Sequence, residues 1–134
     1  MIDRHDKEEF GKLLLRLGVG SLMLFHGYSK LMNPGTLDWL GGTLAGNGLP
    51  SALAYGVYVG EVLAPLMIIV GLYTRLGGWL IVVNMLFAIG LAHSGDLLSL
   101  GEHGGWALEL QGFYLLGGLV VAMFGSGKLA FRPD

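Results

Sequence analysis

Ionisable side chains inside long apolar stretches are the residues of this chain best placed to do chemistry. Arg16, His26, Glu61 and Glu109 each lie in a stretch that is otherwise uncharged or nearly so. Hydrocarbon cannot hydrate charge, so such groups pair, change protonation state or line a wet cavity, and they commonly mark functional sites in membrane proteins. A histidine and a carboxyl group can also exchange protons with a ligand or hydrogen-bond to it.

Glu61 is the strongest candidate for a functional residue among these four. It lies about eleven residues into its apolar stretch, which places it near the bilayer midplane at about 1.5 Å per helical residue. Pro65 follows four residues later and has no N–H, so the carbonyl of Glu61 loses its usual helical partner. We expect a functional carboxylate here; the structural alternative is an ion pair with Arg16 or a hydrogen bond to Asn84.

Polar groups of the first stretch share one helical face. Arg16 and Lys30 belong to a series of residues that recur every three or four positions, so they lie on one face of the helix. His26 lies about 40° from Lys30 around the helix axis, so these groups can line one cavity. Arg16 lies about a turn inside the stretch, where we expect its long side chain to reach back to water.

The third and fourth stretches contribute further candidates. Asn84 and His93 are nine residues apart and point in nearly opposite directions on a regular helix, so at most one of them faces inward. Glu109 begins the last stretch, where a first-turn acid is favoured by the helix dipole. His26, His93 and Glu109 fall in the outer third of the bilayer, so we predict a polar pocket that opens outward.

Helices of membrane-spanning length must position these groups. Four stretches are each close to the ~20 residues that cross a ~30 Å hydrocarbon layer, and charged residues make up only 13% of the chain. The sequence therefore predicts an all-α fold, an integral membrane antiparallel four-helix bundle in a single transmembrane domain, 1–134. The expected spans are 13–31, 50–73, 76–92 and 106–124, and the expected outer loops are 32–49 and 93–105.

The first stretch does not have the pattern of a signal peptide. The residues before it are mixed in charge, Arg16 interrupts it and no A-x-A site follows, so we expect a retained helix. Lysine and arginine gather on the side that holds both termini and the loop near Arg75, while Lys30 is on the other side. The positive-inside rule then predicts cytoplasmic termini in a bacterial-type inner membrane.

Composition excludes several other functions. The net charge is −2 and there is no basic run, so nothing indicates a nucleic-acid partner. The chain has no cysteine, which excludes thiol chemistry and iron–sulfur ligation by its own residues. The histidines do not follow a metal-binding spacing, so we predict no metal site.

Several motifs together resemble the DoxX family of small four-span membrane proteins. Besides Glu61, Asn84 and Glu109, they are RLG at 16–18, FHGYSKL at 25–31, GLP at 48–50, GLYTR at 71–75 and GSGK at 125–128. The resemblance implies a membrane partner in quinone-linked electron transfer, because a relative is a subunit of a thiosulfate:quinone oxidoreductase.

A quinone is physically compatible with these residues, because it resides in the hydrocarbon layer and needs polar contacts and a proton path. We expect His26 and Glu61 to contact it, with Arg16, Lys30 and Glu109 setting the local field. The chain would position quinone for a redox partner subunit. A small transporter or channel coupled through Glu61 and a structural subunit of a membrane complex are the alternatives, and a homo-dimer is possible in each case.

Overall fold

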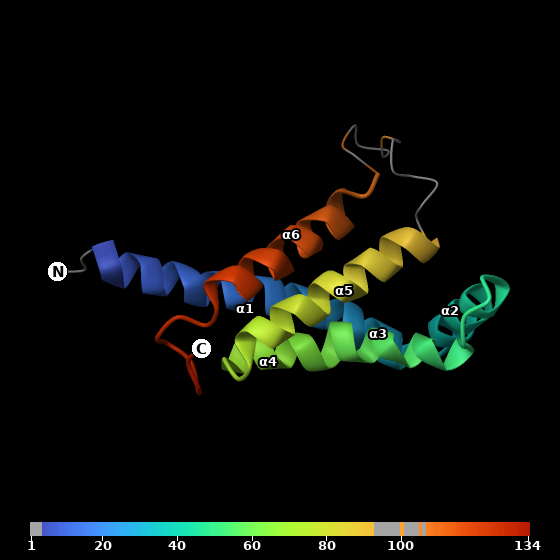
Figure 1. Cartoon of the computed structure of the whole chain (residues 1–134), viewed down its shortest axis with the longest axis horizontal. Helices are drawn as coiled ribbons and strands as arrows, with labels where there is room; N and C mark the ends of the chain where they lie inside the picture. The colour runs from blue at the N-terminus through green and yellow to red at the C-terminus, as the bar shows by residue number, and fades with distance from the viewer. Residues whose placement is uncertain (1–3, 93–99, 101–104, 106) are drawn as a thin grey trace.

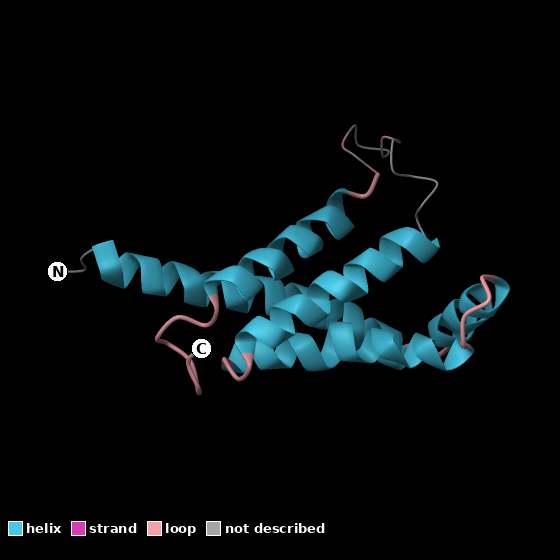
Figure 2. Ribbon diagram, in the orientation of Figure 1, coloured by secondary structure: helices cyan, strands magenta, loops and turns pink. Residues whose placement is uncertain are grey.

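The computed structural model describes residues 4–92, 100, 105 and 107–134, and its regular elements are all helices (Figures 1 and 2). This confirms the all-α fold class predicted from the sequence. His93, Trp106 and most of the predicted outer loop 93–105 lie outside the described residues.

The first helix, α1 (Arg4–Met32), is longer than the predicted span because it begins in the charged N-terminal segment. Pro34 follows its end, where a proline disfavours helical geometry in the preceding residue. A second helix, α2 (Gly35–Gly46), occupies most of the predicted outer loop 32–49. Gly48 follows α2 with a φ of +77°, a conformation that glycine adopts at little cost.

The predicted span 50–73 is a run of four consecutive helical segments. They are the 3₁₀ segment η1 (Ser51–Tyr55), α3 (Gly56–Tyr58), the π-helical segment η2 (Val59–Leu63) and α4 (Ala64–Val70). Pro65 explains the π segment, because its ring clashes with the carbonyl four residues earlier and its nitrogen cannot donate. A wider local turn accommodates both effects, and Glu61 lies in that turn.

Two further helices complete the structure. Helix α5 (Thr74–Ala92) follows a tight turn at Gly71, and α6 (Glu109–Phe124) begins three residues after the predicted start of the last span. Gly78 and Gly118 lie where these two helices meet: a Cβ on Gly78 would come within 2.7 Å of the Gly118 carbonyl oxygen. Small residues at such positions let two helix backbones approach closely.

The long helices pack in a ring. Helix α1 packs against α4 and α6, and α5 packs against the same two helices. Figure 1 shows the C-terminal segment near the turn between α4 and α5, the start of α1 extending beyond it on the same side, and α2 at the opposite end of the molecule. Gly20 lies against Ile68 and Gly27 against Glu61, so α1 and the helix from Ser51 to Val70 run in opposite directions.

Polar and apolar side chains are distributed unlike those of a water-soluble bundle. Arg16 and Glu61 are almost completely buried, whereas many large apolar side chains are exposed. Among the described residues, one helix, Ser51–Val70, is long and apolar enough to cross a membrane. The segments Thr74–Gly90 and Glu109–Phe124 are apolar but shorter.

Candidate functional site

A partly buried ion pair lies at the centre of the candidate site. The Lys30 Nζ of α1 donates to both carboxylate oxygens of Glu61, each at 2.6 Å. The Asn84 Nδ2 of α5 donates to Glu61 Oε2 at 3.0 Å. The carboxylate therefore links three separate helices, and its side chain is only 2% exposed.

Two glycines bring these helices close enough for the contact. The backbone of α1 at Gly27 lies directly against the carbonyl group of Glu61, and no space remains there for a Cβ. A Cβ on Gly60 would lie 2.8 Å from Asn84 Oδ1. Gly27 thus accommodates the turn that Pro65 widens, and Gly60 lets the amide of Asn84 lie beside Glu61.

A cavity of about 700 Å³ adjoins this ion pair. Its polar end is formed by Lys30, Glu61 and Asn84, and its walls are mainly apolar. The walls come from α2, from the Ser51–Val70 helix and from α5, and they consist of Thr36, Trp39, Leu40, Leu44, Leu53, Gly56, Val57, Val59, Gly60, Leu80, Val83, Phe87 and Ala88.

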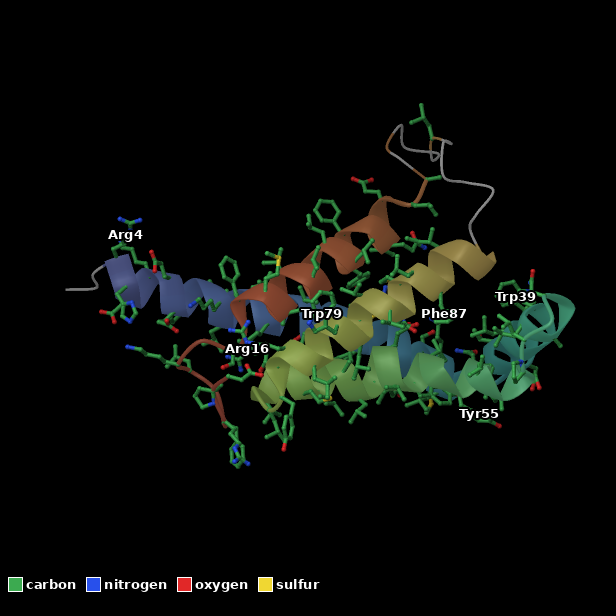
Figure 3. All side chains as sticks on the ribbon, in the orientation of Figure 1. Arg4, Arg16, Trp39, Tyr55, Trp79 and Phe87 are labelled. Carbon is green, nitrogen blue, oxygen red and sulfur yellow. The ribbon has the colours of Figure 1, made fainter. Side chains whose placement is uncertain are left out.

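The apolar end of the cavity reaches the surface of the protein. Trp39, Leu53, Val83 and Phe87 line it and are each about half exposed. Figure 3 shows Trp39 on α2 and Phe87 on α5, both toward the α2 end of the molecule. The half-exposed part of the lining is thus apolar, while the Glu61 side chain is almost completely buried.

Arg16 is not the partner of Glu61. We expected its side chain to reach back to water, and that prediction is wrong. Its side chain is 1% exposed and lies at the other end of the bundle, beside the C-terminal segment (Figure 3). The guanidinium donates to the carbonyl oxygens of Ile68 at 2.9 Å, Ser126 at 3.0 Å and Leu129 at 2.6 Å. Ile68 lies in the last turn of α4, and Ser126 and Leu129 follow α6. None of these carbonyl oxygens has a backbone N–H one turn further along its helix to accept from.

The other candidates are not among the residues that line the cavity. His26 is half-buried and its ring meets the edge of Tyr114 on α6, with ring centroids 5.4 Å apart. Glu109 is exposed in the first turn of α6, the position that the helix dipole favours. His93 lies outside the described residues.

The sequence marked Lys30 as a ligand-binding candidate that also sets the local field, but it did not reveal Lys30 as the partner of Glu61. The relevant signal was its place on the same helical face as Arg16, one helix turn beyond the small residue Gly27. The sequence does not show how far α1 and the Ser51–Val70 helix are shifted along each other. Because η1 and α2 extend past the end of α1, Glu61 lies beside the last two turns of α1. Of the two structural alternatives for Glu61, the hydrogen bond to Asn84 is present and the ion pair with Arg16 is not.

Comparison with known proteins places this architecture in a family. Residues 11–94 match the DoxX family, and this segment includes Lys30, Glu61 and Asn84 of the cavity. This chain belongs to the DoxX family. DoxX proteins are membrane-associated, in agreement with the exposed apolar helices.

A curated relative of this DoxX protein has a redox name. "Putative oxidoreductase CatD" of Bacillus subtilis is 32% identical over 126 residues, which cover 93% of this chain and 87% of the relative. No solved structure matches the chain significantly.

Proposed function

We propose that this DoxX protein is a four-span protein of the cytoplasmic membrane that binds a quinone and positions it for a partner oxidoreductase subunit. The observation that carries the proposal is the cavity that joins the Lys30–Glu61–Asn84 group to an apolar opening. Cavities of this size accommodate small organic ligands, and a few placed polar groups orient them.

The four-span arrangement is supported by the surface of the helices. Soluble proteins rarely expose large continuous apolar areas, but a lipid-facing surface must be apolar. Each long helix exposes such side chains, including Leu22 and Phe25, Leu63 and Leu66, Val83 and Leu86, and Phe113 and Leu116. With the positive-inside rule, both termini are cytoplasmic and the cavity lies in the outer half of the bilayer.

The residues present fit a quinone. A ligand dissolved in the hydrocarbon layer can enter through an opening lined by Trp39, Leu53, Val83 and Phe87 without crossing water. Lys30 and Asn84 are hydrogen-bond donors of the kind that a quinone carbonyl accepts. A bound quinone would supply the electron-transfer chemistry that this cysteine-free chain lacks in its own side chains.

The test is thermal stabilisation by a short-chain quinone analogue. At 100 times its Kd, a ligand stabilises the native state by about 2.7 kcal/mol. Ala88→Phe places a ring in the cavity and should abolish most of this shift, and Glu61→Gln should weaken it. Leu86→Phe on the exposed face of α5 is the matched control and should respond as the wild type does.

The alternative functions predict different results. If the analogue gives no shift in the wild type, but Glu61→Gln abolishes pH-driven uptake by liposomes, the protein is a transporter. If both assays are silent and a membrane protein co-purifies, a structural subunit is the better description.

A further inference from the structure

The carboxylate of Glu61 already accepts three hydrogen bonds from within the protein. Oε1 accepts one hydrogen bond from Lys30, and Oε2 accepts one from Lys30 and one from Asn84. Glu61 lines the cavity, but its side chain is only 2% exposed, so a ligand meets the more exposed Lys30 more readily and could replace Lys30 at the carboxylate only by breaking the ion pair. Breaking that pair would leave a buried charge uncompensated, which is strongly unfavourable.

Lys30 does have a free donor. An ammonium group carries three N–H donors, and here two of its bonds go to one carboxylate. The Lys30 side chain is 30% exposed and lines the cavity, so its remaining N–H can meet a ligand there.

The charges at the polar end cancel. Lys30 and Glu61 are the charged residues among the described residues that line this cavity, and together they carry no net charge at neutral pH. An anionic head group would therefore enter without a counter-charge. An uncharged oxygen acceptor can take the free Lys30 donor at no such cost.

We propose that Lys30 donates the hydrogen bond that holds the ligand, that Glu61 is a positioning residue that neutralises Lys30, and that Asn84 in turn positions Glu61. The site then selects uncharged lipophiles that carry a carbonyl-type oxygen over anionic amphiphiles of similar length. This inference rests on the proposed ligand-binding function and specifies its chemistry.

The experiment compares two probes on the purified full chain: a decyl-substituted benzoquinone and dodecanoate. Equilibrium binding and thermal shift are measured for the wild type, Lys30→Met, Glu61→Gln and the double variant, with Lys7→Met at an exposed distant site as the control. We expect the wild type and Lys7→Met to bind the benzoquinone at least tenfold more tightly than dodecanoate.

Glu61→Gln gives the decisive result. Removal of the counter-charge leaves Lys30 cationic and unneutralised, so this variant should reverse the preference and bind dodecanoate at least tenfold more tightly than the wild type does. Lys30→Met should lose at least tenfold in benzoquinone affinity and gain none for dodecanoate. The double variant leaves no unpaired charge and should fold while binding both probes weakly.

Other outcomes separate the two proposals. If Glu61→Gln loses benzoquinone without gaining dodecanoate, the carboxylate itself contacts the ligand and the inference is overturned. The same conclusion follows if Lys30→Met and the double variant bind benzoquinone like the wild type. If the wild type binds neither probe, the proposed function itself fails.

Discussion

Glycine at position 27 shows how one residue controls the site. Pro65 widens the helix around Glu61, and the displaced backbone of that turn meets α1 where Gly27 has no side chain. The same contact fixes the position of Glu61 along the axis of α1, and so its distance from Lys30, which lies one turn beyond Gly27. A glycine that looks unremarkable in a chain with 24 glycines thus determines whether the ion pair can form.

We therefore predict that Gly27→Ala destabilises the protein by about 1–3 kcal/mol, the usual cost of overpacking a tight contact. Gly18→Ala on the same helix is the control. No atom lies within 4 Å of a Cβ built there, so that change should be neutral or stabilising by up to about 1 kcal/mol. Unfolding in detergent measures both, and equal effects from the two substitutions would contradict the packing argument.

The C-terminal segment after α6 is an element that joins both halves of the ring. Arg16 donates to its carbonyls from α1, and Arg75 donates to the last carbonyls of α6, including Met123 at 2.8 Å. The segment also pairs with the end of α4, where the Phe131 N–H donates to the Val70 carbonyl at 3.1 Å. The GSGK motif at 125–128 therefore starts a segment that covers this end of the molecule.

Docking of this segment should depend on pH through Glu9. Glu9 Oε2 accepts a hydrogen bond from the Lys128 backbone N–H at 2.7 Å, and this bond, helped by Lys12, lowers the pKa of Glu9 below its ordinary value. The stabilisation is complete above the ordinary glutamate pKa of about 4.3 and is lost as the pH falls through the lower folded value.

We expect the Lys128 amide to lose protection from hydrogen exchange, relative to intrinsic exchange, as the pH falls from 5 to about 3. Glu9→Gln should already show low protection at neutral pH and little further loss. Glu8→Gln, which removes an exposed pair with Arg4, is the control and should keep the wild-type profile. A wild-type profile in Glu9→Gln would rule out this linkage.

At the scale of the whole molecule, the buried polar groups are separated into two ends. Arg16 and the C-terminal segment occupy the end that holds the chain termini, and the cavity with Lys30 and Glu61 occupies the end near α2. The first group ties helices together through backbone carbonyls, and the second adjoins an open cavity. In the proposed orientation, the contacts that hold the helices together lie on the cytoplasmic side, and the proposed ligand cavity lies on the outer side.

The proposed orientation can be tested with single cysteines, because the chain contains none. We expect Asn47→Cys, just beyond α2, to react with a membrane-impermeant maleimide in intact bacterial cells. Lys128→Cys should react only after the membrane is permeabilised. Both positions are exposed, so a difference in labelling reports the side of the membrane; the opposite pattern would reverse the orientation.

The sequence by itself determined the helical class, the approximate positions of the long helices and the identity of the residues worth examining. Runs of apolar residues can be read locally, because helix length and hydropathy depend on neighbours in the chain. The sequence also offered a hydrogen bond between Glu61 and Asn84 as one of two structural alternatives, since both residues are polar groups in apolar stretches.

Only the tertiary structure decided which cationic residue forms the ion pair with Glu61. The axial offset between α1 and the Ser51–Val70 helix depends on the π segment, on Gly27 and on the extension of η1 beyond α1, and none of these appears in hydropathy. That offset pairs Glu61 with Lys30, sends Arg16 to backbone carbonyls and leaves a cavity beside the ion pair. Contacts between distant segments depend on how helices slide past one another, and the sequence pattern of a single helix does not contain that information.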